Sequence, residues 1–165
     1  MKNPKAIWIT GLSGAGKTTL ANLLRVRLEE VRCRTVLLDG DDLRRGLSSD
    51  LTFSREDRKE QARRAAQMAA LLLDQGFFVV IALISPFRGD REIAKHLIGK
   101  TRFIEVYLNA PLSWCIAHDT KGIYTRHSQV RQTTYEESKS PDVVVYSETE
   151  RPENAAMRVM SFLFD

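Results

Sequence analysis

The sequence predicts an α/β domain in which a parallel sheet is covered by helices on both faces. Three observations support this prediction. Strand-like and helix-like segments alternate along the chain, as they do in consecutive β-α-β units. The segment 77–85, FFVVIALIS, is apolar throughout, as expected for a strand that is buried on both faces. The segment 11–18, GLSGAGKT, places a glycine-rich turn directly between a strand-like and a helix-like segment.

Five segments have the composition of strands. Each is short, free of proline and rich in branched apolar or aromatic residues. Because helical segments separate them, we expect them to form one five-stranded parallel sheet flanked by helices. The predicted strands are residues 6–10, 34–40, 77–85, 101–109 and 142–146.

Three segments have helical patterns. Leucines 20, 23, 24 and 28 share one face of a helix that follows the glycine-rich turn. The segment 54–76 has Ser54 as a candidate cap, Asp57 three residues later and Gly76 as its end. The segment 151–164 has Pro152 near its start, where a helix tolerates proline. No repeat or linker interrupts the series, so residues 1–165 are expected to form a single domain.

The composition restricts the class of protein. The chain has 165 residues, 43% of them hydrophobic, and a formal net charge of +4. This mild charge suits an anionic ligand, but the basic residues form no dense block, so we expect no nucleic-acid partner. Cys33 and Cys115 form no CxxC pair, and no run approaches the roughly 18 apolar residues of a membrane span. We therefore expect a cytoplasmic location and no membrane partner.

The glycine-rich turn matches G-x-x-x-x-G-K-[ST] in full, which predicts the P-loop nucleoside triphosphatase fold. Backbone N–H groups of such a loop and the start of the next helix surround phosphate groups. The Lys17 ammonium is expected to reach the β- and γ-phosphates, and the Thr18 hydroxyl to bind Mg²⁺. The predicted cofactors are therefore ATP, with GTP as the other candidate, and Mg²⁺. The loop residues expected to hold ATP are Gly11, Ser13, Gly14, Ala15, Gly16, Lys17, Thr18 and Thr19.

The motif leaves open where the γ-phosphate goes. A guanine-dependent switch would need N/T-K-x-D, which the sequence lacks, and a motor would need an acid of the Walker B kind, whereas the strand 77–85 ends in Ser85. The segment 119–142 is long and polar, and its stretch from Thr120 to Tyr135 contains Lys121, Arg126, His127 and Arg131 but no acid. These features favour a small-molecule kinase with a basic lid. The domain is thus predicted to be a single P-loop kinase domain with a lid at about 119–141.

Acidic residues follow the second strand, where the ligand crevice of a parallel sheet lies. Asp39, Asp41 and Asp42 are expected near the phosphates. We select Asp41 as the base or orienting group for an acceptor hydroxyl, and as a support for Mg²⁺ through water. The alternative is that these are helix N-terminal acids favoured by the helix dipole. Arg44 follows as a candidate clamp for an anion.

The long helix and the third strand add further candidates for the acceptor site. Arg58 and Gln61 are three residues apart and share a helix face. Phe53 precedes the Ser54 cap and is either a hydrophobic staple or a ring on which a base stacks. Ser85 follows the third strand at the crevice and is either a turn residue or a nucleophile.

These residues together resemble the adenylylsulfate kinase (APS kinase) family, P-loop enzymes that phosphorylate the 3′-hydroxyl of adenosine 5′-phosphosulfate (APS) to give PAPS. The matching text, between Ile7 and Tyr124, is GLSGAGKTT, LDGDDLRRGL, FSREDRKEQARR, LISPFRGDR, FIEVYLNAPL and DTKGIY. The resemblance implies a five-stranded parallel sheet and a homodimer.

The resemblance also implies roles for individual residues. Asp41, Lys17 and Ser85 are the implied catalytic residues, and Ser85 is the serine that carries phosphate in some members. Asp119 and Lys121, with Gly122, open the lid and extend the ATP site. The residues implied to hold the acceptor are Asp41, Arg44, Phe53, Arg58, Gln61, Ile84 and Ser85.

The sequence departs from the family pattern at two places. Gln61 replaces an asparagine, and the lid after Tyr124 is shorter and lacks the phenylalanine that stacks on the second face of the acceptor adenine. Tyr135 is the remaining candidate for that ring, whose loss would weaken binding by roughly 1–3 kcal/mol. A different nucleotide acceptor, such as a cytidine nucleotide, therefore stays open as an alternative. A nucleotide-binding regulatory protein without transfer activity is the more distant one.

Overall fold

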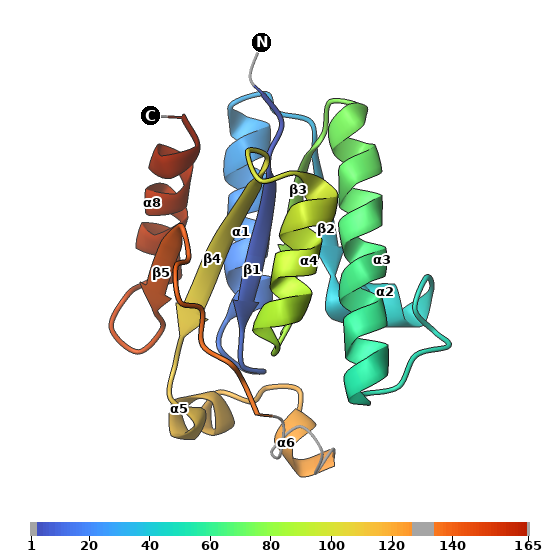
Figure 1. Cartoon of the computed structure of the whole chain (residues 1–165). Helices are drawn as coiled ribbons and strands as arrows, with labels where there is room; N and C mark the ends of the chain where they lie inside the picture. The colour runs from blue at the N-terminus through green and yellow to red at the C-terminus, as the bar shows by residue number, and fades with distance from the viewer. Residues whose placement is uncertain (1–2, 127–133, 165) are drawn as a thin grey trace.

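The computed structural model describes residues 3–126 and 134–164. Within these residues the strands form one five-stranded, entirely parallel sheet in the order β2-β3-β1-β4-β5 (Figure 1). This arrangement confirms the predicted fold class, and every predicted strand is present with shifts of a few residues at its ends. The strands are β1 (Ala6–Gly11), β2 (Thr35–Asp39), β3 (Phe78–Ala82), β4 (Phe103–Asn109) and β5 (Val143–Tyr146).

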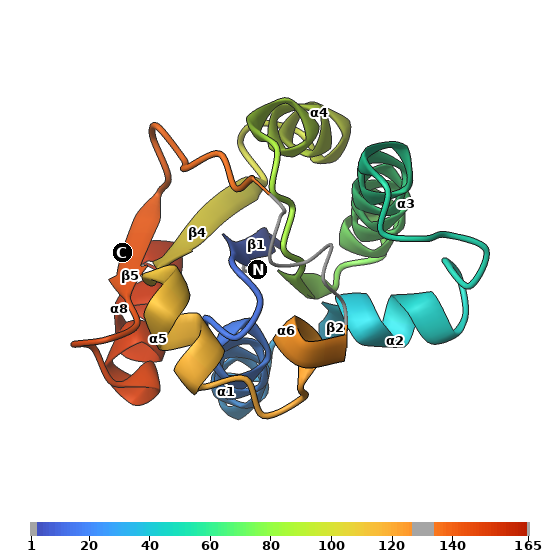
Figure 2. The same cartoon turned by 90° about the horizontal axis from the view of Figure 1, so that it is seen from below.

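Long helices cover both faces of the sheet. Helices α1 (Lys17–Glu30) and α8 (Pro152–Phe164) pack on one face, and α3 (Arg55–Asp74) and α4 (Arg88–Ile98) pack on the other (Figures 1 and 2). Three of these helices confirm the predicted ones, whereas α4 has no counterpart among them. None of the helices in the described part of the chain is long and apolar enough to cross a membrane.

Three short helices lie at the carboxyl ends of the strands, two of them at the lower end of the molecule in Figure 1 and the third beside α3. They are α2 (Gly40–Arg45), α5 (Leu112–Ala117) and α6 (Ile123–Arg126). Because they have six residues or fewer, they are too short to carry a recognisable helical period. Their position places them next to the ligand crevice of a parallel sheet.

Alternating side chains of β1 supply two separate cores. Ile7 and Ile9 pack toward α1 and α8, whereas Trp8 packs toward α3 and α4 beside Phe103, with ring centroids 5.8 Å apart. The face of α3 toward the sheet is built of small residues, which let the helix approach the strands closely. These are Ala62, Ala65, Ala66 and Ala69, all buried.

The ends of α3 follow the sequence prediction. The Ser54 hydroxyl accepts a hydrogen bond of 3.1 Å from the backbone N–H of Asp57. Gly76, just beyond the helix, has a φ of 81°, a left-handed conformation that glycine adopts without strain. Local capping chemistry therefore fixes where the helix that carries Arg58 and Gln61 begins.

Candidate active site

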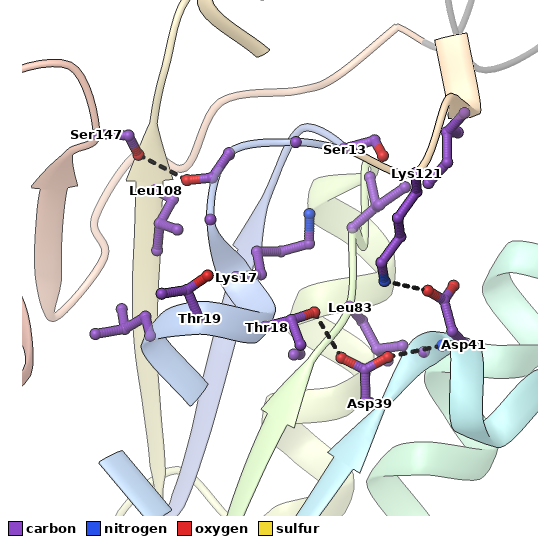
Figure 3. Close-up of a pocket in the computed structure, with 18 of the residues that line it drawn as sticks. Ser13, Lys17, Thr18, Thr19, Asp39, Asp41, Leu83, Leu108, Lys121 and Ser147 are labelled. Carbon is purple, nitrogen blue, oxygen red and sulfur yellow. Dashed lines mark hydrogen bonds and ion pairs between the residues drawn. The ribbon is translucent and has the colours of Figure 1, made fainter. Parts of the chain in front are cut away.

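A cavity of about 640 Å³ opens at the carboxyl ends of the strands. The loop between β1 and α1, helix α2, the loop after β3 and the segment around α5 and α6 surround it (Figure 3). Its size falls in the range of sites that bind small molecules. The residues predicted to be catalytic, to bind ATP or to bind the acceptor all line it except Gly11, which precedes the lining part of the phosphate loop. Gly122, at the predicted lid, does not line it.

The phosphate loop needs glycine for steric reasons. Gly11 and Gly14 have φ values of 150° and 78°. A Cβ at Gly11 would lie 2.7 Å from the Leu108 carbonyl oxygen, and one at Gly14 would lie 2.6 Å from the Cys115 carbonyl oxygen. The loop therefore sits tightly between β4 and α5, and no larger residue fits there.

Lys17 begins α1 and folds back over the loop. Its Nζ donates hydrogen bonds to the carbonyl oxygens of Gly11, at 3.0 Å, and Leu12, at 2.6 Å. Burial lowers the pKa of the Lys17 ammonium to about 8, although Asp39 and Asp41 nearby favour its charged form. The negative charge of a bound polyphosphate would stabilise the charged form of this desolvated ammonium at close range.

Thr18 and Asp39 form an oxygen-rich pair at the edge of the cavity (Figure 3). The Thr18 hydroxyl donates to Asp39 Oδ2 at 2.8 Å, and Asp39 Oδ1 accepts from the backbone N–H of Asp41 at 2.9 Å. Asp39 was expected near the phosphates, but it has no assigned role among the predicted site residues. Its signal in the sequence is its place as the last residue of a buried strand.

These oxygens fit Mg²⁺, which takes hard oxygen ligands and keeps several waters and substrate phosphates. No cluster of three or more His, Cys, Asp or Glu side chains that could hold a metal ion occurs in residues 3–126 and 134–164. An ion held by Thr18 and Asp39 would therefore depend on the phosphates of a nucleotide for its other ligands. This dependence is typical of P-loop enzymes.

Asp41 projects from α2 toward the lid. Lys121 Nζ donates to Asp41 Oδ2 at 2.5 Å, and this ion pair raises the pKa of Lys121 (Figure 3). Asp42 differs from its neighbour, since it is exposed, pairs with Arg45 at 2.8 Å and does not line the cavity. Asp42 therefore fits the interpretation as a helix N-terminal acid, whereas Asp41 lines the cavity, as expected for a residue that acts on a substrate.

Two arginines converge on Phe53 at the other side of the cavity. The guanidinium carbons of Arg44 and Arg58 lie 4.4 Å and 5.4 Å from the centroid of the Phe53 ring. Burial lowers the pKa of both guanidinium groups, and the charge of Arg44 lowers that of Arg58 further. Two desolvated cations beside a half-buried ring have the chemistry that suits an anion with an aromatic group.

Gln61 and the loop after β3 complete this side. Gln61 Nε2 donates to the Gly40 carbonyl oxygen at 3.1 Å, which ties α3 to α2. The Ile84 carbonyl oxygen accepts from the Thr10 hydroxyl at 2.7 Å. Ser85 Oγ is buried and accepts from Trp8 Nε1 at 3.1 Å, so the hydroxyl proposed to carry phosphate is engaged with an indole.

The front of the predicted lid packs on the phosphate loop. The buried Tyr124 donates from its hydroxyl to the Ser13 carbonyl oxygen at 2.6 Å. Asp119 Oδ2 accepts from the backbone N–H of Tyr124 at 2.8 Å, which holds the turn that carries Lys121. Asp119, Lys121 and Arg126 line the cavity. The predicted basic residues His127 and Arg131 lie outside the described residues.

Tyr135, the candidate for the second ring opposite Phe53, lies outside the cavity. Its ring stacks on Tyr107, with centroids 5.7 Å apart and planes 8° from parallel, and its hydroxyl shares a hydrogen bond of 2.8 Å with Thr10. It does not line the cavity. Tyr135 therefore packs into the sheet and does not provide a second ring opposite Phe53.

The cavity also has an end that the sequence motifs do not mark, near α5 and β5. Trp114 and His118 stack there, with ring centroids 3.9 Å apart. The Ser147 hydroxyl donates to the Ala15 carbonyl oxygen at 2.9 Å, and Glu150 lies nearby on the cavity lining. These residues come from separate segments, so only the folded chain assembles them. Their aromatic and polar character suits the base and sugar of a nucleotide whose phosphates lie on the loop.

The fold, the phosphate loop and the cations across the cavity define a P-loop phosphotransferase. Residues 3–146 match the family model described as adenylylsulphate kinase, and the chain belongs to that family. An adenylyl-sulfate kinase of Pseudomonas aeruginosa is 44% identical over 169 residues, which cover 98% of this chain and 86% of that protein.

Solved structures agree with this membership. The APS kinase of Mycobacterium tuberculosis, in complex with AMPPNP and APS, superposes with a TM-score of 0.92 at 33% identity, with all of both chains covered. A hexameric APS kinase from Thiobacillus denitrificans gives a TM-score of 0.76 at 27% identity. That match covers 98% of this chain and 29% of the other.

Proposed function

We propose that this protein transfers the γ-phosphate of ATP to the 3′-hydroxyl of APS, giving PAPS and ADP. The main support for the proposal is that two sets of charged groups line the same cavity. Lys17 and Thr18 lie on one side, Arg44 and Arg58 on the other, and Asp41 projects from α2 between them. Such an arrangement holds two anionic substrates with a carboxylate close to where they meet.

The proposed reaction assigns a role to each group. The phosphate loop and the Lys17 ammonium bind the β- and γ-phosphates and stabilise the charge that develops on them. The Asp41 carboxylate orients the acceptor hydroxyl and accepts its proton as the O3′–P bond forms and the bond from Pγ to the β–γ bridging oxygen breaks. Bound Mg²⁺ supplies charge neutralisation at the phosphates, with Thr18 and Asp39 on the protein side.

The acceptor is proposed to bind on the side of Phe53. The phosphosulfate anion pairs with the guanidinium groups of Arg44 and Arg58, and the adenine stacks on the Phe53 ring. Ile84 and Ser85 form the wall of this side.

ADP release from Mg-ATP, measured with a panel of acceptors, tests the proposal. We expect turnover with APS at micromolar concentration, and none with cytidine nucleotides or other nucleotide conjugates. Lys17→Ala should abolish this turnover, while Lys5→Ala, which removes an exposed lysine bonded to the Thr101 carbonyl oxygen, should not. Strong activity with a cytidine nucleotide but not with APS would assign another acceptor. If ATP is not consumed with any acceptor, the result would support a nucleotide-binding regulatory role without transfer activity.

The proposal extends to assembly and location. A homodimer is proposed on the strength of the family resemblance, and light scattering of the purified chain would distinguish it from a monomer or a hexamer. The two free thiols of Cys33 and Cys115 are buried, which fits a reducing compartment such as the cytoplasm.

A further inference from the structure

Ser85 has an unusual backbone conformation for its position. Its φ is 44°, in the left-handed region that non-glycine residues seldom adopt. It lies in the turn that leads from β3 to α4, and this turn lines the acceptor side of the cavity through Ile84, Ser85 and Pro86. A strained conformation of this kind persists only when surrounding contacts hold it.

Arg91 makes one of the contacts that hold this turn, together with Thr10 and Trp8. It projects from α4 and its side chain is 3% exposed. Its guanidinium donates to the Ser85 carbonyl oxygen at 2.6 Å and to the Glu136 carbonyl oxygen at 2.6 Å, and it pairs with Glu105 Oε1 at 3.1 Å. One buried side chain thus joins the turn after β3, strand β4 and Glu136 near the end of the predicted lid segment.

The partners of Arg91 are themselves fixed. Ser138 donates a short hydrogen bond to Glu105 Oε1, and the Glu105 backbone N–H donates to Asp142 Oδ2 at 2.8 Å. The backbone N–H of Glu136 donates to the Pro86 carbonyl oxygen at 2.8 Å. The guanidinium carbon of Arg91 also lies 5.3 Å from the centroid of the Tyr135 ring. The Arg91 guanidinium therefore sits in a rigid frame.

We propose that Arg91 is a positioning residue for the acceptor: it fixes Ser85 in its left-handed conformation and so sets where the turn 84–86 meets the acceptor. Arg91 does not line the cavity, so it acts through Ser85. This inference rests on the proposed function in one respect, because the acceptor whose binding it affects is taken to be APS. Arginine suits the task because its planar fork donates to several acceptors at fixed angles, which a lysine ammonium cannot reproduce.

The test compares three variants. Arg91→Met removes all three contacts, and Arg91→Lys keeps a positive charge beside Glu105. Arg102→Met is the matched control, since Arg102 also joins two elements, through the Ile98 carbonyl oxygen at 3.0 Å and Asp74 at 2.6 Å, but does not line the cavity or contact Ser85. Each variant is assayed for kcat, for KM of APS and of ATP, and for its melting temperature.

We expect Arg91→Met to raise the KM for APS about tenfold while the KM for ATP changes less than about twofold. Arg91→Lys should give a smaller rise, and it answers the same question if Arg91→Met does not fold. Arg102→Met should lower the melting temperature, but it should not change the KM for APS relative to the KM for ATP. Equal changes in both KM values for the Arg91 variants, or no change in either, would overturn the proposal.

A second readout does not depend on any acceptor. Trp8 Nε1 donates to Ser85 Oγ, and in a Trp114→Phe background Trp8 is the remaining tryptophan of the two in the sequence. We expect Arg91→Met to shift Trp8 emission and Arg102→Met to leave it unchanged. If the wild-type protein does not act on APS, the proposed function fails, yet this shift still tests whether Arg91 holds Ser85. Unchanged emission would show that it does not.

Discussion

Lys121 Nζ lies 2.5 Å from Asp41 Oδ2, although the two residues are 80 positions apart in the sequence. The pair joins the turn before α6 to α2 across the mouth of the cavity. The ion pair holds Asp41, which we propose as the base, next to Lys121. The family resemblance places Lys121 at the ATP site. The predicted lid and the proposed base are therefore joined by an ion pair, and both side chains are about half exposed.

Asp41→Asn removes the proposed base while keeping the size of the side chain. We expect kcat to fall by roughly 10²–10⁴, the usual contribution of a positioned general base. The measurement is single-turnover formation of PAPS at saturating substrates. A fall of less than tenfold would show that the assignment of Asp41 is wrong.

Asp42→Asn is the matched control for that experiment. Asp42 is the next residue on α2, but it is exposed and pairs with Arg45 away from the cavity. We expect kcat and KM to stay near the wild-type values and stability to change by no more than about 0.5 kcal/mol. A large loss of activity in this variant would mean that the effect at Asp41 reflects helix α2 as a whole.

Asp39→Asn tests whether Asp39 helps to hold Mg²⁺, a role that the structure indicates and that the sequence did not predict. Asparagine can still accept the hydrogen bond from the Asp41 N–H, so the start of α2 should be preserved. Loss of the negative charge next to Thr18 should raise the Mg²⁺ concentration for half-maximal activity about tenfold. Titration of Mg²⁺ at fixed ATP measures this shift. An unchanged Mg²⁺ requirement together with a lower melting temperature would assign Asp39 a structural role instead.

The lowered pKa of Lys17 predicts how ATP binding depends on pH. Burial moves this pKa from 10.5 to about 8, so above pH 8 the free folded protein binds fewer protons than the unfolded chain. Its stability should therefore rise with pH in that window, while its affinity for ATP, which favours the ammonium form, should fall. We expect the Kd for Mg-ATP to increase about tenfold between pH 7 and pH 9. Lys17→Arg, which cannot lose its charge, should show a flat profile in calorimetric titrations.

Phe53→Ala tests the stacking surface for the acceptor. Removal of the ring should weaken APS binding by roughly 1–3 kcal/mol and leave the KM for ATP unchanged. Phe77→Ala is the control, because Phe77 also packs under an arginine, with Arg34 at 3.9 Å, but lies outside the cavity. If both variants raise the KM for APS equally, Phe53 contributes through stability and does not stack on the acceptor.

Much of the fold could be predicted because its signals are local. The buried strand 77–85, the cap at Ser54 and the glycine-rich turn each depend on residues that are close together in the sequence. Helices α5 and α6 were missed because they are too short to show a period, and α2, equally short, was considered only in the alternative interpretation of the acids after the second strand. The amphipathic α4 was missed although its buried face, Ala94 and Ile98, repeats at helical spacing.

The sequence by itself determined the five-stranded parallel sheet, the phosphate loop and the resemblance to APS kinases, since each strand and each motif is a short run of contiguous residues. Only the tertiary structure decided that Tyr135 stacks on Tyr107 and not opposite Phe53, that Asp39 meets Thr18, and that Arg91 holds Ser85. These contacts join segments far apart in the chain. Which residues contact each other depends on the sheet face that each side chain occupies and on where each strand ends. Neither can be read from the sequence, because both are set by the folded chain.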